Sequence, residues 1–552
     1  MSFSYQTASS TQQFINSLGV NTHIDFVNSP YSNTAIVENS INYLGIKNLR
    51  DSPDMPADLG ASGLWQKVAN ATGAKFDAFL REGSVAHMQG DLASAATLAS
   101  QGILNFIEGG NEEDDQAALN AGNSLATTAS YQKQVYTTGQ KYGLPVINMS
   151  FGQGWSTSAT GDYGKVGSLA AYADYANAHT YAGTGNTPGS ALATLDADAR
   201  LAATGRPVIT TEFGYYTSGS STDVTSVSQT VQAKYVLDGV MDAFSQGDAK
   251  TYLYELLDEQ SGNGAAWGNF GLFTSSGAAK PAATALHNLT TLLADKGGAF
   301  TPGALGYSLS GTLSTDHSLL LEKSDGTFWV ALWNEARLSG PSSTAAITVP
   351  NHTVTLGLAA TAGTVQIYDP LSGTSAQQTL HDVSTAAISV PDHPILVEIT
   401  PSGTGSGIGT GSGSGTSSSA GTGSSAGTGT SAGAPATVPQ DLSISVPTAP
   451  SLAHGASSAL AGIALHDAWA QSHSGSMALD LSAGSGTLKI TEGGATLSGH
   501  SVHLSGSLSE LNADLATLHY QAANLVGVDT LTVSAWNQAG VSSTHALAVH
   551  VI

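Results

Sequence analysis

Eight short runs of β-type sequence alternate with longer helical segments over residues 1–296, and this alternation restricts the fold more than any other feature. Stretches such as 91–101 and 131–142 have the helical pattern. Eight strands alternating with helices over roughly 250–300 residues predict an α/β fold, the (β/α)8 TIM barrel. An open, doubly wound sheet is the alternative, but no G-x-G-x-x-G motif follows the first run. The eight runs are residues 19–26, 46–51, 75–82, 103–109, 146–151, 173–181, 207–215 and 251–257.

The sequence after the barrel divides into three further parts. Residues 297–400 contain strand-like runs without helical periodicity, which predicts an accessory all-β sandwich. Of the 36 residues in 401–436, 33 are Gly, Ser, Thr or Ala and none is charged, so this segment is expected to be a flexible linker. Residues 437–552 are again rich in strand-like runs and predict a second all-β domain.

Charge and composition exclude several classes of function. The chain has 17 Lys and Arg against 41 Asp and Glu, a net charge of −24, which repels nucleic acid and anionic membranes. It has no cysteine, so disulfides, thiolate metal sites and thiol catalysis are absent. No apolar run approaches the roughly 18–20 residues of a membrane helix, so we expect no membrane insertion. The first basic residue is Lys47, and the start therefore lacks the basic region of a secretory signal peptide.

Polar residues stand where the predicted strands end, which is the functional end of a barrel. Several of these ends carry groups capable of acid–base chemistry or hydrogen bonding. They are His23 in the first run, Arg50 in the second, Asn111 and Glu112 after the fourth, His179 and Tyr181 in the sixth, and Glu212 in the seventh.

The two glutamates are the candidate catalytic pair. Glu212 interrupts an apolar run, where an unpaired carboxylate would cost several kcal/mol, so it needs a function or a partner such as Arg50. Glu112 lies in an acidic group at an expected helix start, and alone it is explained by the helix dipole. Two carboxyl groups facing each other across a barrel mouth, about 5–5.5 Å apart, are what retaining glycoside hydrolysis requires.

The order of these motifs resembles clan GH-A of the glycoside hydrolases. Asn-Glu ends the fourth run, His-x-Tyr the sixth and Glu the seventh, and the segments GVNTHIDF, LGIKNLRD and YELLDE look most like family 39 and its bacterial exopolysaccharide-cleaving relatives. The resemblance covers residues 1–296 and also includes WGNFGLF at 267–273. One departure concerns the end of the eighth strand, where many clan members have a sugar-stacking Trp but this sequence reads Leu256-Leu257-Asp258-Glu259.

The resemblance implies roles for individual residues. Glu112 would be the acid/base, Glu212 the nucleophile and Asn111 the partner of the sugar 2-hydroxyl. Tyr181 and Arg50 would tune Glu212. The remaining substrate-binding candidates are His179, His23, Trp155 and Trp267; each Trp would stack on a sugar ring, with core packing as the alternative. The chemistry requires no cofactor and no metal ion.

The last domain resembles the cadherin-like modules of large bacterial surface and secreted proteins. The residues that carry this resemblance are LHYQA at 518–522, VDTLTV at 528–533 and WNQAG at 536–540. Such proteins commonly leave the cell by type I secretion, which would place this chain outside the cell or on its surface without a cleaved N-terminal signal. The module would then attach the protein to a surface or matrix. No EF-hand loop is present that would indicate calcium binding.

These observations predict a retaining O-glycoside hydrolase that acts within a polysaccharide, namely a bacterial exopolysaccharide or a cell-wall glycan. A non-catalytic glycan-binding surface protein is the alternative from another class, although such a protein has no need of both Glu112 and Glu212. A transglycosylase with the same residues is the other alternative, and the sequence does not separate it from a hydrolase.

If the linker is flexible, the segment 401–552, here called the tail, should not be needed for activity, and this can be tested by deleting it. We predict that deleting residues 401–552 leaves turnover of a soluble substrate nearly unchanged, because a flexible linker lets the two bodies act independently. Steady-state kinetics of the truncated and full-length chains would measure this. A large loss of activity in a truncated protein that remains folded would mean that the tail contributes to the site.

Overall fold

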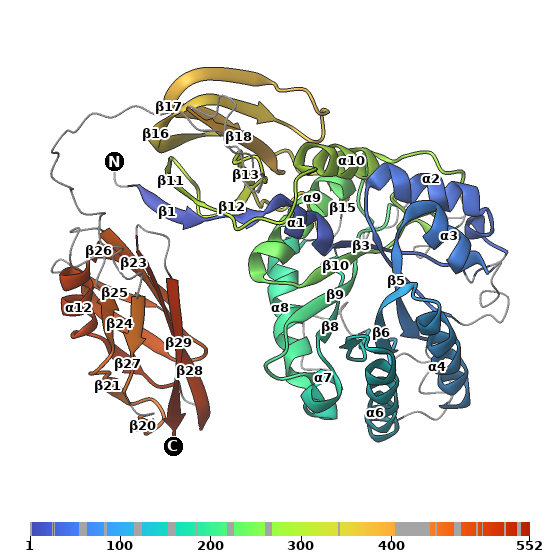
Figure 1. Cartoon of the computed structure of the whole chain (residues 1–552), viewed down its shortest axis with the longest axis horizontal. Helices are drawn as coiled ribbons and strands as arrows, with labels where there is room; N and C mark the ends of the chain where they lie inside the picture. Colours follow the sequence, from blue (N-terminus) through green and yellow to red (C-terminus); the bar gives the residue numbers. More distant parts are fainter. Residues whose placement is uncertain are drawn as a thin grey trace, which may run out of the picture. The chain divides into compact units, whose positions relative to one another are not determined.

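The chain is divided into two compact units in the computed structural model, Met1–Ser406 and Gly407–Ile552. Figure 1 shows the helices and strands of both. The residues described are 3–24, 26, 28–53, 63–81, 85–114, 124–152, 162–183, 185–217, 226–259, 268–340, 343–402, 442–447, 450–467, 476–492, 495–499, 501–523, 526–537 and 542–552.

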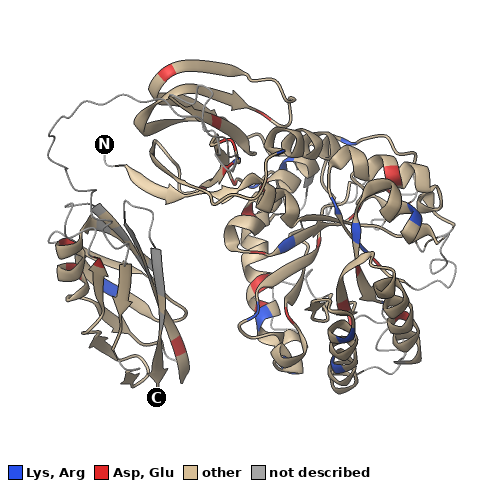
Figure 2. Ribbon diagram, in the orientation of Figure 1, with Lys and Arg blue, Asp and Glu red and all other residues tan. Residues whose placement is uncertain are grey.

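The second unit is the predicted all-β domain, and within its described residues a single helix accompanies the strands. Its strands form a five-stranded sheet, a four-stranded sheet and a two-stranded ribbon around a single apolar core. In Figure 2, Lys and Arg occupy few positions of the described chain. Among the described residues, no helix has the length and apolarity needed to cross a membrane. The elements are β19 (Leu442–Ser445), β20 (Ser451–Leu452), β21 (Ser457–Ala459), β22 (Ala464–Asp467), β23 (Ser476–Ala483), β24 (Thr487–Glu492), β25 (Ala495–Gly499), β26 (Ser501–Ser507), α12 (Leu508–Leu515), β27 (His519–Gln521), β28 (Gly527–Asn537) and β29 (Ser542–Val551).

The first unit contains the predicted parallel barrel. Eight strands pair in the order β7-β6-β5-β4-β3-β10-β9-β8, and all these pairings are parallel. A parallel bridge between Ile147 and Tyr175 joins the two ends of this path. The prediction of a (β/α)8 barrel is therefore confirmed, and each strand falls within one of the eight runs or one residue outside it. The strands are β3 (Leu18–Asn21), β4 (Asn48–Asp51), β5 (Lys75–Leu80), β6 (Leu104–Gly110), β7 (Val146–Ile147), β8 (Ala176–Thr180), β9 (Val208–Phe213) and β10 (Lys250–Leu253).

Helices surround the barrel strands (Figure 1). The two helices expected at 91–101 and 131–142 both begin earlier than predicted. The later one begins at Leu125 because the Ser124 hydroxyl caps it by accepting the Thr127 N–H, in a polar stretch that has no apolar period. The helices are α1 (Thr11–Ser17), α2 (Thr34–Leu44), α3 (Leu64–Thr72), α4 (Val85–Ser100), α6 (Leu125–Tyr142), α7 (Asp162–Val166), α8 (Pro188–Ala202), α9 (Gln229–Gln246) and α10 (Pro281–Leu293).

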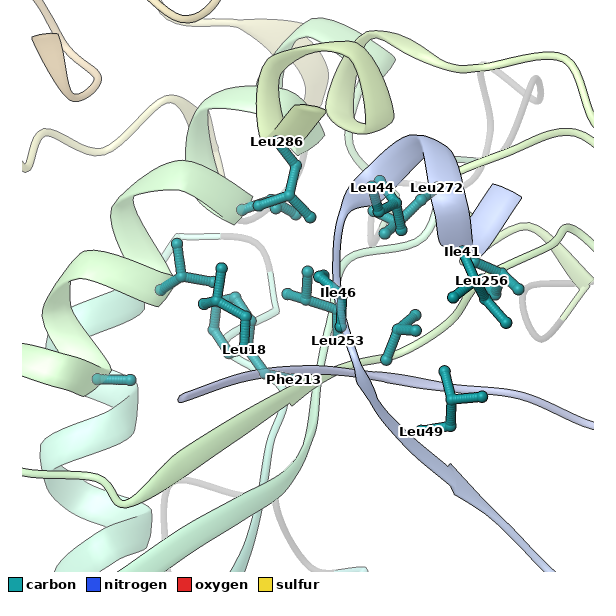
Figure 3. Packing of buried hydrophobic residues seen from close by; sticks show 14 of the residues in the cluster. Leu18, Ile41, Leu44, Ile46, Leu49, Phe213, Leu253, Leu256, Leu272 and Leu286 are labelled. Carbon is teal, nitrogen blue, oxygen red and sulfur yellow. The ribbon is translucent and has the colours of Figure 1, made fainter. Parts of the chain in front are cut away.

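The largest apolar core lies between the strands and these helices. Figure 3 shows side chains of α2 and α10, among them Ile41 and Leu286, together with strand residues such as Leu18 and Leu253. All four are fully buried. Parallel strands covered by helices bury their apolar side chains on both faces, which explains their nearly continuous apolar sequences.

The accessory β domain is built on one continuous sheet of eight strands. The sheet order is β1-β11-β16-β18-β13-β12-β2, with β17 paired to β16. The sequence assigned the first ten residues to the barrel, whereas β1 and β2 pair with β11 and β12 of this domain. The four residues of β1, Ser4–Thr7, are polar and carry no local sequence signal of pairing with β11, which lies some 300 positions further along the chain. The strands are β1 (Ser4–Thr7), β2 (Ser9–Ser10), β11 (Ala304–Ser310), β12 (Asp316–Glu322), β13 (Phe328–Asn334), β16 (His352–Tyr368), β17 (Gln378–Val390) and β18 (Ile395–Pro401), with a separate ribbon of β14 (Ser339–Gly340) and β15 (Ser343–Ala346).

Strand β13 joins the β domain to the barrel. Successive side chains of a strand point to opposite faces. Phe328, Val330 and Leu332 belong to the core of the β domain. Trp329 and Trp333, on the other face, belong to the same core as the barrel helices. All seven residues of the strand are buried, so the barrel and the β domain share an apolar interface.

This shared core predicts a stability effect. Replacing Trp333, which is fully buried, with Ala should lower the free energy of unfolding by about 3–5 kcal/mol, because it leaves a large cavity. Leu201→Ala, at an exposed position of α8, is the control and should change stability by less than about 0.5 kcal/mol. Denaturant titration of the 1–406 unit measures both, and equal effects would contradict the shared core.

Candidate active site

The barrel brings the predicted residues of strands two, four, six and seven together at the carboxyl end of the sheet. Arg50 lies in β4, His179 in β8 and Glu212 in β9, while Asn111 and Glu112 directly follow β6. Tyr181 follows β8 and is also buried at this mouth. Trp155 and Trp267 lie outside the described residues, and their predicted stacking on sugar stays a prediction.

Arg50 forms the centre of the site. Its Nε and Nη2 donate to the two carboxylate oxygens of Glu108, each at 2.7 Å. Nη1 donates to Glu212 Oε1 at 2.7 Å and to Asn21 Oδ1 at 2.9 Å, and Nη2 also donates to Asn111 Oδ1 at 2.7 Å. The side chain is 1% exposed, so the guanidinium is compensated by protein groups and not by solvent.

Glu212 is held in its ionised form. Burial favours the neutral carboxyl, but His179, Arg50 and the Tyr181 hydroxyl outweigh it and lower the pKa of Glu212. Tyr181 donates to Glu212 Oε2 at 2.5 Å. Burial and the Glu212 charge raise the pKa of Tyr181 well above its usual value, so the phenol keeps its proton as a donor. The arrangement provides a buried, ionised carboxylate with two donors fixed against it.

The position of the Glu112 side chain depends on an unusual backbone conformation. Its φ is 44°, in the left-handed region, which costs an ordinary L-residue about 1–2 kcal/mol. The Ser150 hydroxyl accepts the Glu112 N–H at 3.0 Å and supports this conformation. Its carboxyl lies over Gly152, where an added Cβ would come within 3.0 Å of Cδ. Glu112 is 28% exposed at its side chain against 9% for Glu212, so it is the more accessible carboxyl of the pair.

His179 lies between the two carboxyl groups. Its Nδ1 is 2.9 Å from Glu112 Oε1 and 3.5 Å from Glu212 Oε2. Burial disfavours its protonation, but the Glu212 charge and the bond to Glu112 prevail and raise its pKa. One donor atom from each of these three residues lies within 4.8 Å of the others, a spacing that suits a metal ion. Arg50 and Tyr181 already donate to both oxygens of Glu212, so a cation would compete with them there.

His23 lies at the same end of the barrel, beside the residues that follow the eighth strand. Its Nε2 is 3.2 Å from the Tyr254 hydroxyl and 3.6 Å from Glu255 Oε2. Burial, together with the charge of Arg81, lowers the pKa of His23 to about 3, so the imidazole is neutral near pH 7. The structure therefore assigns His23 a neutral hydrogen-bonding role.

Sequence reasoning missed several residues of this site. Glu108 and Asn177 complete the polar layer below the mouth, and Asn177 Nδ2 donates to Glu108 Oε1 at 2.9 Å. Glu108 interrupts the apolar run of β6, which is the same signal that singled out Glu212.

Tyr254 was missed because the eighth strand was predicted to extend to residue 257. The strand ends at Leu253, so Tyr254 is the first residue beyond it. Its ring packs with those of Tyr181 and Phe270, with centroids 6.0 and 5.3 Å away. An aromatic residue therefore does stand at the end of this strand, two residues before Leu256, the first of the positions considered from the sequence.

No family model matches the chain, and no curated protein matches it. Among solved structures, the chain is similar to a monomeric β-xylosidase from Caulobacter crescentus CB15, at 13% identity and a TM-score of 0.50 over 72% of this chain and 98% of the other. A glucosidase from Croceicoccus marinus matches at 11% identity and a TM-score of 0.49, covering 72% and 97%. A family 39 glycoside hydrolase from Bacteroides cellulosilyticus WH2 matches at 14% identity and a TM-score of 0.47, covering 71% and 82%. At these identities the likeness concerns the fold.

The contact between Tyr181 and Glu212 predicts a shift in titration. Tyr181→Phe removes a donor to the charged form and should raise the pKa of Glu212. A carboxyl group with a lowered pKa stabilises the fold above its unfolded-state pKa, and this contribution is lost as the pH falls through the folded-state value. The variant should therefore lose less stability on acidification than the wild type.

Carboxyl NMR of the protein labelled with ¹³C-glutamate measures this pKa. Tyr215→Phe is the matched control, since the buried Tyr215 hydroxyl has no hydrogen-bond partner among the described residues. An unchanged titration of Glu212 in Tyr181→Phe would show that the short contact does not stabilise the carboxylate.

Proposed function

We propose that the protein is a retaining O-glycoside hydrolase with Glu212 as nucleophile and Glu112 as acid/base. The observation that carries the proposal is the pair of unlike carboxyl groups at one barrel mouth. Glu212 is buried and ionised, Glu112 is more exposed, and one oxygen of each lies within 4.8 Å of the other. Close spacing of this kind supports a direct attack by the enzyme, since inverting enzymes leave room between the carboxyls for water.

In the first step, a Glu212 oxygen attacks the anomeric carbon and the bond from that carbon to the leaving oxygen breaks. Glu112 transfers its proton to the leaving oxygen, so an alcohol departs and a glycosyl ester of Glu212 remains. Arg50 and Tyr181 hold the nucleophile in place and keep it ionised until it attacks. A prearranged set of donors of this kind needs no reorganisation during the reaction.

In the second step, Glu112 takes a proton from water while the water oxygen attacks the anomeric carbon. The ester bond breaks, Glu212 returns as a carboxylate and the product retains its configuration. Glu112 must therefore exchange protons with the cleft, and its greater exposure suits this role. His179, bonded to Glu112 and close to Glu212, is placed to orient both carboxyls. Asn111 completes the mouth next to Arg50 and is available to the sugar 2-hydroxyl.

The acid–base character of the site supports an enzyme over a binding protein. A glycan-binding surface gains affinity from aromatic faces and neutral hydrogen bonds. It gains nothing from a strained glutamate beside a second, ionised glutamate, whereas strain of this kind is typical of catalytic residues. Transfer of the glycosyl group to a sugar in place of water uses the same residues and differs only in the acceptor.

We further propose that the substrate is a polysaccharide, that cleavage is internal, and that the protein works outside the cell or on its surface. The scarcity of basic residues suits neutral or cationic glycans better than polyanions. The Gly- and Ser-rich linker suits a catalytic unit that moves relative to an anchoring domain. Screening on bacterial exopolysaccharides and cell-wall glycans, with products analysed by size, tests substrate and cleavage mode together.

Two glutamate variants test the mechanism. Glu212→Ala should lose about a thousandfold or more of activity on every substrate, because no glycosyl ester forms. Azide should restore part of the turnover by entering the vacated space, and its glycosyl azide should have inverted configuration. Glu112→Ala should lose far more activity on substrates with poor leaving groups than on activated aryl glycosides, and azide should give it a product of retained configuration.

Glu38→Ala, in the outer helix α2, is the control and should keep wild-type kinetics. NMR of the glycosyl azides assigns the configuration. Exchanged stereochemical outcomes would reverse the two roles, and full activity in both variants would refute a glycosidase.

A further inference from the structure

A group of ionisable side chains lies where the barrel and the β domain meet, away from the proposed active site. Asp242 comes from α9, His317 from β12 and Glu335 from the residue after β13. His317 Nδ1 is 2.7 Å from Asp242 Oδ1, and His317 Nε2 is 3.5 Å from Glu335 Oε2. One imidazole nitrogen and two carboxylates from two domains therefore converge at one place.

The spacing of this trio fits a small cation. One donor atom from each residue lies within 4.8 Å of the others. Ligands of a first-row divalent ion lie about 2.0–2.2 Å from the metal, so any two of them are at most about 4.4 Å apart. A small side-chain adjustment would bring all three donors into one coordination sphere.

An oxygen without a partner is directed into this group. Asp242 is 1% exposed, and its Oδ2 accepts no hydrogen bond of good geometry in the part of the chain that the structure describes, although the Trp333 indole and the Glu335 carboxyl lie near the Asp242 carboxyl. Gly189, at the start of α8, leaves room for it, since an added Cβ would lie 3.1 Å from Asp242 Oδ2 and 2.9 Å from Glu335 Oε1. The Gly189 N–H donates to Glu335 Oε1 and orients that carboxylate. In known metal sites, hydrogen bonds of this type from groups that do not touch the metal orient its ligands.

The surroundings also carry surplus negative charge. Asp238 lies one helical turn before Asp242 on α9, is fully buried, and has no partner for either carboxylate oxygen among the described residues. Burial raises its pKa well above the usual value, as do the neighbouring Asp242 and Glu335. Lys234, the nearest lysine on this helix, is bonded to Asp392 at 2.6 Å. His317 is thus the only cationic group among the described residues that bonds directly to Asp242 or Glu335.

We propose that Asp242, His317 and Glu335 bind a first-row divalent cation of the Zn²⁺ type, which links the β domain to the barrel. An imidazole with two carboxylates is a donor set that suits zinc and similar ions, whereas Ca²⁺ takes oxygen ligands. His317 also lines a cavity of about 250 Å³ in the β domain, together with Asp316 and several apolar residues. Because ligands from both domains are needed, the ion stabilises the interface that β13 forms.

A shared proton is the competing explanation. Burial and the charge of Asp242 raise the pKa of Glu335 to about 7, so the two carboxyls can also reduce their repulsion by protonation. In that case a lower pH would stabilise the interface whether or not a metal ion is present, because protonation of Glu335 would remove its repulsion of Asp242. The two explanations differ in their response to a chelator.

The test uses the full chain, free of affinity tags and treated with a chelator. Addition of Zn²⁺ at about one hundred times its dissociation constant should raise the melting temperature of the first unit by about 5 °C. Equilibrium dialysis with metal analysis should find about one tightly bound Zn²⁺ per chain. Co²⁺ should quench tryptophan fluorescence, since the Trp333 ring centroid lies 5.3 Å from that of His317.

Two variants remove a ligand with little change of shape. Glu335→Gln keeps an acceptor for the Gly189 N–H, and His317→Gln keeps a polar side chain; each should weaken Zn²⁺ binding at least about tenfold and abolish the thermal shift. Asp248→Asn is the matched control, because Asp248 is also buried with one unpartnered oxygen but has no histidine bonded to it in the described residues. It should bind Zn²⁺ like the wild type.

Three results would overturn the proposal. One is a chelated wild type that neither binds Zn²⁺ stoichiometrically nor gains thermal stability, including the case in which it is stabilised only by lower pH. Another is undiminished binding in both ligand variants, which would place the ion elsewhere. The third is a preference for Ca²⁺ over Zn²⁺, which would contradict the donor set.

Discussion

The hydrogen bonds and ion pairs of the buried Arg50 guanidinium hold the other polar side chains of the site in place. A charge removed from water in this way is costly unless every donor is matched, and removing one partner of such a buried pair typically costs about 3–5 kcal/mol. Arg50 meets this condition with Glu108, Asn21, Asn111 and Glu212, which stand in or directly after three different barrel strands. The Phe79 ring lies 4.1 Å from its guanidinium carbon. The same contacts that stabilise the cation also position Glu212 and Asn111.

The site combines this rigid layer with a strained residue above it. Glu212 is held by fixed donors from below, whereas Glu112 depends on a left-handed backbone conformation supported by Ser150 and Gly152. The two carboxyls consequently have different environments although they lie close together. Different environments are what allow one carboxyl to be ionised while the other exchanges a proton.

The β domain is joined to the barrel in three ways. Strand β13 places Trp329 and Trp333 in the barrel's apolar core, and its other face fills the core of the β domain. Close to this apolar contact, Asp242 of α9 meets His317 and Glu335 of the β domain. The N-terminal strands β1 and β2 add a third connection, because the chain passes through the β domain before it enters the barrel. The β domain is therefore part of the fold of the first unit and not an appendage to the barrel.

The local features of this protein can be predicted from its amino-acid sequence. Eight runs of β-type residues and the helices between them defined the barrel, and polar residues at the strand ends identified Arg50, His179, Tyr181, Glu112 and Glu212. The barrel prediction is confirmed, and the strand ends could be located, because hydrophobic period and strand ends are properties of neighbouring residues. The roles of the residues at those ends stay predictions. The same local rule applied to β6 would have found Glu108, whose carboxylate interrupts an apolar strand.

Contacts between distant segments of the chain are visible in the folded protein but not in its sequence. The pairing of β1 with β11, the place of Tyr254 at the barrel mouth, and the meeting of Asp242 with His317 and Glu335 all join segments far apart in the chain. Such contacts leave no periodic signal, because they depend on how whole elements pack and not on the residues beside them. The ionisation of Glu212 belongs to the same class, since it follows from the burial and charges that the fold brings around it.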